Sequence, residues 1–121
     1  MTSPRQALGR WGENLAADFL IQKGYLVLER NFRTPYGEID LIVQKENLLV
    51  FVEVKTRSTD AFGLPEEAIT PKKRTHLITT AQRYLQKFPA PAVDWRIDVI
   101  AIRTLKNEVA PEIVHFENAV T

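Results

Sequence analysis

The sequence contains no cysteine, no long apolar run and no strong excess of charge of either sign. The absence of cysteine excludes disulfide bonds, thiolate zinc sites and cysteine nucleophiles. No apolar run reaches the roughly 18 residues of a membrane span, and residues 1–6 lack the apolar stretch of a signal peptide. We therefore expect a cytoplasmic protein that has no membrane partner.

The charges nearly cancel, with 16 lysines and arginines against 15 acidic residues and a net charge of +1. A polyanionic partner would therefore have to be held by a local basic patch rather than by overall charge. The length of 121 residues suits one domain with a real core, and 45% hydrophobic content is ordinary for a globular protein. We expect a single domain spanning residues 1–121.

Charged residues interrupt the most apolar part of the chain, residues 37–55. This stretch consists of two apolar strands joined by a short polar turn, and strands of this composition are usually buried on both faces. It nevertheless contains Glu38, Asp40, Glu53 and Lys55. Buried charges are costly unless they are paired, neutralised or bound to a metal, so these four residues need an explanation.

The register of this hairpin suggests one explanation. If residues 46–47 form a two-residue turn, Asp40 faces Glu53 and Glu38 faces Lys55, all on one side of the sheet. Two carboxylates at about 5 Å repel each other unless a cation lies between them, and hard oxygen ligands suit Mg²⁺ or Mn²⁺. The alternative is a plain Glu38–Lys55 ion pair, with Asp40 and Glu53 at a solvated edge.

The residues before this hairpin predict a helix over 4–23, ended by Gly24. Gly12 and Ala16 lie beside the apolar stripe and would allow a close approach to a sheet. Glu13 lies on the flank, where it could reach over the sheet edge; an exposed glutamate is an equally good interpretation. The predicted stripe consists of Leu8, Trp11, Leu15 and Phe19.

A second helix is predicted from Thr70, a good N-cap, followed by Pro71 at the first helical position. Its apolar face comprises Leu77, Ile78, Ala81, Tyr84, Leu85 and Phe88. Further strands are expected at 25–31, 95–102 and 112–116, turns at 34–37 and 106–107, and a loop over 56–65. The resulting order is helix, three strands, helix, two strands, which indicates an α/β sandwich around a mixed central sheet.

Several cations are placed where they could contact phosphates. Three of them fall in the first turn of the second helix, where they oppose the helix dipole unless they meet a phosphate backbone. Another lies at the root of the 56–65 loop and one beside the 34–37 turn, and simple solvation remains the alternative for all of them. The nucleic-acid-binding candidates are Arg33, Arg57, Lys72, Lys73 and Arg74.

Other polar residues favour structural roles. Arg96 and Asp98 share one face of a strand and are expected to pair. His76 and His115 are far apart in sequence and fit no ligand spacing.

The ordered motifs resemble those of a known family. Asp40 followed by Glu53-Val54-Lys55 is similar to the signature of the PD-(D/E)xK nuclease superfamily, and Glu13 makes the pattern resemble that of Holliday junction resolvases. The resemblance to small bacterial YraN-like proteins covers nearly the whole chain. It is carried by residues 9–13, 24–25, 30–33, 37–42, 51–57 and 96–99.

The resemblance implies a restriction-endonuclease-like core, a mixed central β-sheet flanked by two helices in the order αβββαββ. It implies that Asp40 and Glu53, with the backbone carbonyl of Val54, bind the metal. Lys55 would activate the attacking water or stabilise the transition state, and Glu13 would assist. Ile39 stands where the superfamily pattern has proline.

We therefore expect a Mg²⁺- or Mn²⁺-dependent endonuclease that acts on DNA, with branched or recombination intermediates as candidate substrates. A homodimer is plausible because resolvases act as dimers, and no small-molecule cofactor is expected. The first rival is a non-catalytic nucleic-acid-binding module on a nuclease fold. The second is a structural or interaction protein with no nucleic-acid partner, which would show no salt-dependent DNA binding.

Overall fold

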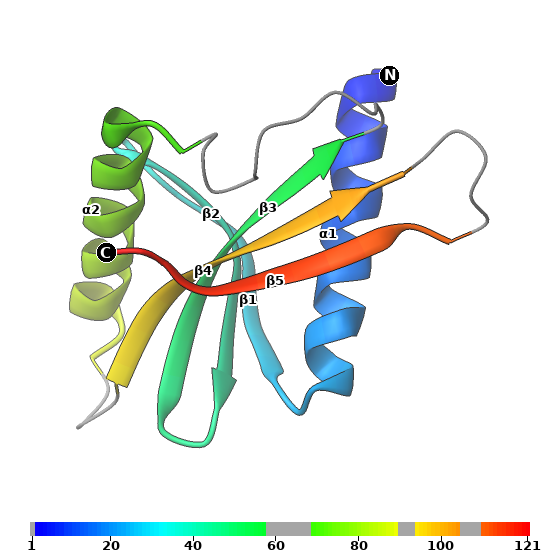
Figure 1. Ribbon diagram of the computed structural model, residues 1–121. Coiled ribbons are helices and arrows are strands. Elements are labelled where there is room, and N and C mark those ends of the chain that lie inside the picture. The colour runs from blue at the N-terminus through cyan, green and yellow to red at the C-terminus, as the bar shows by residue number, and fades with distance from the viewer. Residues whose placement is uncertain (1, 58–68, 90–93, 105–109) are drawn as a thin grey trace.

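The computed structural model describes residues 2–57, 69–89, 94–104 and 110–121. Helices lie on both faces of one sheet (Figure 1). The elements are, in chain order, α1 (Pro4–Gln22), β1 (Leu26–Thr34), β2 (Gly37–Lys45), β3 (Leu48–Arg57), α2 (Pro71–Lys87), β4 (Asp94–Arg103) and β5 (Glu112–Val120).

The five strands form one sheet in the order β1-β2-β3-β4-β5. The β3–β4 pair is parallel and the other neighbouring pairs are antiparallel, so the sheet is mixed. A parallel pair needs a crossover connection, and α2 lies within this one. The αβββαββ order and the two flanking helices give the restriction-endonuclease-like core that the sequence predicts.

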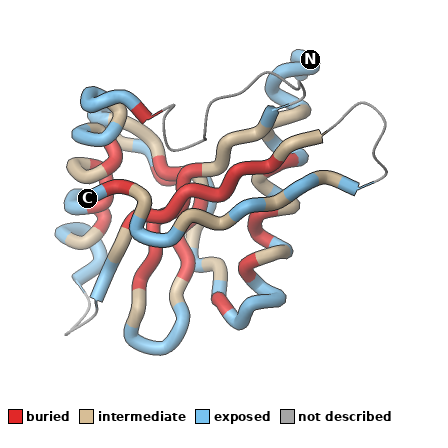
Figure 2. The backbone as a smooth tube through the Cα atoms, viewed as in Figure 1, coloured by how far each residue is buried: buried red, intermediate tan, exposed pale blue. Residues whose placement is uncertain are grey.

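Each helix covers a separate hydrophobic core. On one face, α2 packs against β1 and β2, and the core includes Phe51, Leu77 and Ile97. On the other face, α1 packs mainly on β3, and the core includes Leu20 and Val52. Figure 2 shows the buried residues concentrated along the central strands. This double burial explains why the central strands are apolar on both faces.

The boundaries of α1 follow from its end residues. Ser3 accepts a hydrogen bond from the Gln6 N–H, and the Gln6 side chain accepts one from the Ser3 N–H, which makes a capping box. At the other end Gly24 has a φ of 95°, a conformation that glycine adopts without steric cost. The predicted helix and its stop signal are therefore confirmed.

The predicted apolar stripe of α1 is confirmed in part. Leu15 and Phe19 are partly buried against the core, and Gly12 and Ala16 are buried, as their expected close approach to the sheet requires. Trp11, which the stripe included, is 38% exposed, and the remaining buried residues of the helix are Ala17 and Leu20. The small residues face the sheet because the helix approaches β3 very closely. A Cβ atom on Gly12 would collide with the side-chain hydroxyl of Thr56.

The predicted start of α2 is confirmed, but the predicted burial of Phe88 at its end is wrong. The Thr70 hydroxyl accepts a hydrogen bond from the Lys73 N–H, and Pro71 occupies the first helical position. Phe88, assigned to the apolar face, is 44% exposed because it lies just past the last helical residue. The buried residues of α2 are Leu77, Thr80, Ala81 and Tyr84.

Four strands are longer than predicted, and β3 includes Thr56 and Arg57, which the prediction assigned to the following loop. β1 and β5 each continue through an asparagine with positive φ, Asn31 at 53° and Asn118 at 51°, so polar residues that indicate strand ends instead lie within strands. β4 gains one residue at each end. The predicted turn at 106–107 and most of the 56–65 loop lie outside the described residues. No helix in the described ranges is long and apolar enough to cross a membrane.

Candidate active site

The β2–β3 hairpin has the register that the sequence predicts. Its ladder runs from Lys45 opposite Leu48 to Leu41 opposite Val52. The turn therefore consists of residues 46–47, as predicted. The two-residue turn was an assumption of the prediction, and its confirmation brings the predicted side chains to the open end of the hairpin.

The ladder ends just before Asp40 and Glu53. Here the carboxylate of Asp40 takes the place of a backbone acceptor, and its Oδ2 accepts a hydrogen bond of 2.7 Å from the Val54 N–H. Burial, and next the negative charge of Glu53, raise the pKa of Asp40 to about 7, although the Val54 N–H opposes the shift. The two carboxylates therefore act strongly on each other.

Glu53 is the most buried of the predicted site residues, with 6% of its surface exposed. Its Oε1 lies 3.4 Å from the Nζ of Lys55 and 3.4 Å from the Nζ of Lys73. Lys55 comes from the same strand, two residues further on, whereas Lys73 comes from the first turn of α2. The sequence proposed Lys73 only as a phosphate contact, so this second cation on Glu53 is a finding of the structure.

Glu13 reaches the same site from α1, as the flank position allowed. Burial, and next the charge of Glu38, raise the pKa of Glu13. With its amide nitrogen turned toward the acids, Asn31 donates to the Oε1 of Glu13 at 3.1 Å and to the Oε1 of Glu38 at 2.8 Å. Asn31, which has a positive φ of 53°, was not among the predicted site residues.

Glu38 does not pair with Lys55, which was the alternative interpretation of the hairpin. Its Oε2 lies 3.3 Å from the Nε of Arg33, its neighbour across the β1–β2 ladder. Glu38 still belongs to the acidic group, because its charge helps raise the pKa of Asp40. The Arg33 guanidinium, predicted to contact phosphates, is thus partly neutralised.

A cavity of about 600 Å³ opens at this end of the sheet. The N-terminal half of α1, from Pro4 to Glu13, forms one wall, and the ends of β2 and β3 form the other. Asp40, Glu53 and Val54 line it together with Arg57. The structure therefore brings one of the predicted phosphate contacts, Arg57, to the carboxylate pair.

The remaining predicted phosphate contacts lie apart from the cavity wall. Lys72 and Arg74 are exposed in the first turn of α2, and within the described ranges neither takes part in an ion pair. They flank Lys73, which points its ammonium group at Glu53. The three cations predicted as one patch are thus divided between the carboxylate site and the surface.

A second buried carboxylate, Asp98 on β4, has a different environment. It is fully buried and accepts hydrogen bonds from the Arg96 guanidinium (2.9 and 3.2 Å) and the Asn118 N–H (2.8 Å). The Nε2 of His115 lies 2.7 Å away. Burial raises the pKa of Asp98, but the hydrogen bonds from His115, Arg96 and Asn118 outweigh it and hold that pKa below its ordinary value. The expected Arg96–Asp98 pair is confirmed.

The carboxylates of the cavity suit a hard divalent cation. In the described part of the chain, the Oδ1 of Asp40 and the Oε2 of Glu53 take part in no hydrogen bond or ion pair. Two such oxygens on strongly interacting carboxylates are donors that Mg²⁺ and Mn²⁺ prefer. Among residues 2–57, 69–89, 94–104 and 110–121, no three His, Cys, Asp or Glu side chains gather as a metal site, so a backbone or water oxygen would have to complete the ligand set.

Comparison with known proteins identifies the family. A model of the uncharacterised protein family UPF0102 matches residues 12–102. A UPF0102 protein of Syntrophomonas wolfei is 48% identical over 93% of this chain and 96% of its own. The UPF0102 protein of Desulfitobacterium hafniense is 47% identical over 94% of this chain and 96% of its own. That of Syntrophotalea carbinolica is 42% identical over 98% of this chain and 95% of its own. The matched region contains every residue of the carboxylate site, and the chain belongs to the uncharacterised protein family UPF0102.

Proposed function

We propose that this protein is a metal-dependent endonuclease that hydrolyses phosphodiester bonds in DNA. The observation that carries the proposal is the Asp40–Glu53 pair, which lines a cavity at the open end of the central hairpin. A carboxyl group such as Asp40, whose pKa is raised by burial and by the charge of a second carboxylate, is a poor structural element but a good ligand for a cation. Asp40, Glu53 and the backbone carbonyl of Val54 would hold Mg²⁺ or Mn²⁺.

A divalent ion bound here would polarise the phosphate and lower the pKa of a bound water. The protein supplies the remaining groups. Lys55 is held 3.4 Å from Glu53 with 23% of its side chain exposed, so its ammonium group is partly desolvated and fixed in place. We assign it the task of orienting the attacking water or of stabilising the negative charge that develops in the transition state.

The other wall of the cavity has a supporting role in this proposal. Glu13 has a raised pKa and shares Asn31 with Glu38, so it is suited to accept or hold a proton near the carboxylate pair. Arg57 lines the cavity next to the carboxylates, and its guanidinium suits a DNA phosphate on either side of the scissile bond.

The resemblance to Holliday junction resolvases favours branched or recombination DNA as the substrate and a homodimer as the active form. A net charge of only +1 requires that the phosphates be contacted through local groups such as Arg57, Lys72 and Arg74. We therefore expect the affinity for DNA to fall strongly with added salt, but less steeply than for a highly basic protein.

A second candidate is a nucleic-acid-binding module without catalysis. The observation that favours it is that Lys55 and Lys73 already neutralise Glu53 from two sides. Two cations on one carboxylate could take the place of a metal ion and leave a stable, inert site. Cleavage separates the two candidates, because the binding module would cut no substrate whether or not it holds a divalent ion.

The test is cleavage of labelled single-stranded, duplex, flap and four-way DNA with Mg²⁺ or Mn²⁺. The wild type is compared with Asp40→Asn, Lys55→Ala and the control Asp18→Asn, which removes a carboxylate from the exposed side of α1. The proposal expects metal-dependent cleavage that is lost in Asp40→Asn and Lys55→Ala and retained in the control. Metal binding by calorimetry without cleavage of any substrate would favour the binding module, and no metal binding by the wild type would overturn the proposed site.

A further inference from the structure

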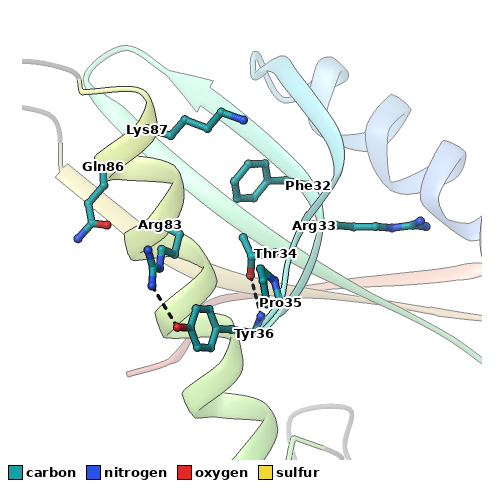
Figure 3. A pocket seen from close by; sticks show the side chains of 8 residues that line it. All are labelled: Phe32, Arg33, Thr34, Pro35, Tyr36, Arg83, Gln86 and Lys87. Atoms are coloured by element: carbon teal, nitrogen blue, oxygen red, sulfur yellow. Dashed lines mark hydrogen bonds between the residues drawn. The ribbon is translucent and has the colours of Figure 1, made fainter.

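A second cavity, of about 500 Å³, lies between the β1–β2 turn and the C-terminal half of α2 (Figure 3). Its walls include Phe32 and Tyr36 from the hairpin and Arg83, Gln86 and Lys87 from the helix. None of these residues belongs to the carboxylate site. Aromatic rings next to cations are the combination by which proteins bind bases and phosphates of single strands.

The charge of this cavity is entirely positive. Arg33, Arg83 and Lys87 contribute to its lining, and no acidic residue does. Since the whole chain has a net charge of +1, the rest of the chain is net negative. Arg33 pairs with Glu38 and points away from the other side chains in Figure 3, whereas no ion pair within the described ranges engages Arg83 or Lys87. Their contacts are with aromatic side chains, Arg83 with Tyr36 and Lys87 with the Phe88 ring, so neither positive charge is neutralised by a carboxylate of the described residues.

An accessible aromatic ring lies beside these cations. Tyr36 is 44% exposed. The Arg83 guanidinium carbon lies 5.0 Å from the centre of its ring, and an Arg83 nitrogen donates a 3.1 Å hydrogen bond to its hydroxyl. Phe32 is almost fully buried and packs edge-on against Tyr84, at 5.2 Å between ring centres. The cavity thus has a firm apolar base and a half-exposed ring at its side.

The β1–β2 turn that carries Tyr36 is fixed in position. The Tyr36 N–H donates to the Thr34 hydroxyl at 3.1 Å. The turn also sits tightly on α2, since a Cβ atom on Gly37 would lie 3.3 Å from the Thr80 hydroxyl and 3.4 Å from the Cβ of His76. A ring held in this way is already placed for stacking, so little conformational entropy is lost when a ligand binds.

We infer that this cavity binds one unpaired nucleotide of the nucleic-acid substrate, with its base stacked on Tyr36 and its phosphate contacted by Arg83 and Lys87. A duplex keeps its bases stacked inside, so only an unpaired or displaced nucleotide can present a base face to this ring. The inference rests on the proposed nuclease function for its substrate. It adds that the protein distinguishes single-stranded or branched nucleic acid from continuous duplex.

The hairpin connects this cavity to the carboxylate site. Arg33 belongs to the cavity lining and is joined to Glu38, whose charge acts on Asp40. Tyr36 also lies in the turn that opens β2, the strand that carries Asp40, so the proposed nucleotide site and the carboxylate site share one strand.

The test measures binding without cleavage, by fluorescence anisotropy with EDTA and no divalent ion. Labelled single-stranded and duplex oligonucleotides of equal length are titrated with wild type, Tyr36→Leu, Tyr36→Phe, Arg83→Ala and the control Arg10→Ala, which removes an exposed cation of α1. Tyr36→Leu should weaken single-strand binding by about tenfold, and Tyr36→Phe by no more than about twofold, because the ring is what stacks. Arg83→Ala should lower the salt slope by about 0.7, the value for one phosphate contact with a single strand.

A 2-aminopurine base in the single strand supplies a second readout. Its fluorescence should be quenched on binding to wild type and Tyr36→Phe and remain unquenched with Tyr36→Leu. Equal loss of single-strand and duplex binding in Tyr36→Leu, or tight binding with no quenching by wild type, would overturn the inference. Cleavage that is absent while these binding differences persist would reject the nuclease proposal and leave the nucleotide site standing.

Discussion

Two aspartates of the same sheet, Asp98 fully buried and Asp40 half-buried, have opposite surroundings. Asp98 on β4 is enclosed by a guanidinium, a histidine and a backbone N–H, and its pKa is held below the ordinary value. Asp40 on β2 has other carboxylates as its charged neighbours and a pKa raised to about 7. Burial alone raises the pKa of both. The difference therefore lies in the neighbours: three hydrogen-bonding groups outweigh burial at Asp98, whereas the Val54 N–H does not outweigh burial and the charge of Glu53 at Asp40.

This difference separates a residue that supports the fold from a residue available for chemistry. The hydrogen bonds of Asp98 join β4 to Asn118 and His115 of β5 and, through Arg96, to the Tyr25 hydroxyl at 3.0 Å. Asp40 has one hydrogen bond, to the Val54 N–H, and no cationic partner among the described residues. The same substitution, aspartate to asparagine, should consequently have opposite effects on stability at the two positions.

The largest effect is expected for Asp98→Asn. Removing this charge leaves the Arg96 guanidinium without its main partner, and breaking a buried pair in this way costs on the order of 3 kcal/mol. Urea unfolding at pH 7 measures the loss. Glu117→Gln is the matched control, because Glu117 contacts the same guanidinium at 3.5 Å from an exposed position and should change stability by less than about 0.5 kcal/mol.

The dependence of this loss on pH has a definite sign. The folded-state pKa of Asp98 is depressed, so its stabilisation is present above the ordinary aspartate pKa of about 3.9 and disappears as the pH falls through the folded-state value. The difference between wild type and Asp98→Asn should therefore be constant near neutral pH and shrink below about pH 4. A difference that grows toward acid pH would contradict the assignment.

The next effect concerns the helix that carries Glu13 to the acidic site. Gly12→Ala places a Cβ atom against the Thr56 hydroxyl, and overpacking of this kind costs about 1–3 kcal/mol. The double variant Gly12→Ala/Thr56→Ser, which keeps the hydroxyl, should not recover this loss, whereas Gly12→Ala/Thr56→Ala should recover part of it. Thermal unfolding of the wild type, Gly12→Ala and the two double variants, with Thr56→Ala alone as control, measures the coupling between positions 12 and 56. An unchanged melting temperature in Gly12→Ala would disprove the close approach.

A smaller effect of opposite sign is expected for Asp40→Asn. The raised folded-state pKa, about 7, means that the wild type loses stability as the pH rises from about 4 to about 7, because the unfolded chain ionises first. Removing the charge should therefore stabilise the protein by roughly 1–2 kcal/mol at pH 8 and by little at pH 4. Urea unfolding at both pH values tests this, and destabilisation at pH 8 would show that Asp40 is a structural residue like Asp98.

The smallest change is expected for Glu38→Gln. Burial and the charge of Glu53 are the main causes of the raised pKa of Asp40, and Glu38 adds to them. Glu38→Gln should therefore lower the pKa of Asp40, and the decrease should be smaller than the one caused by Glu53→Gln. NMR titration of the Asp40 carboxyl carbon measures both shifts. Glu46→Gln, in the exposed turn between β2 and β3, is the control and should leave the pKa of Asp40 unchanged.

Local signals in the sequence were enough to predict the frame of the site. The two-residue turn fixed the β2–β3 register, and Thr70 with Pro71 fixed the start of α2. The proximity of Asp40 to Glu53 follows directly from that register. The pairing of Arg96 with Asp98 follows in the same way from the alternation of side chains along one strand.

Contacts between distant elements could not be predicted in this way. Gly12 and Ala16 predict a close approach of α1 to a sheet, but the apolar stripe does not identify Thr56 as the contact of Gly12 or show that Trp11 is exposed. The reach of Lys73 to Glu53 and the bridging of two glutamates by Asn31 depend on packing between elements far apart in sequence. The same applies to His115, whose hydrogen bond to Asp98 joins β5 to β4.

The most direct test of the contrast between the two aspartates is an NMR titration of both carboxyl groups, with and without Mg²⁺. Without metal, Asp40 should titrate near pH 7 and Asp98 below its ordinary value. Mg²⁺ should lower the pKa of Asp40, because a bound cation favours the ionised form, and leave that of Asp98 unchanged. An Asp40 pKa that is ordinary, or that does not respond to Mg²⁺, would contradict the proposal that Asp40 and Glu53 form the metal site.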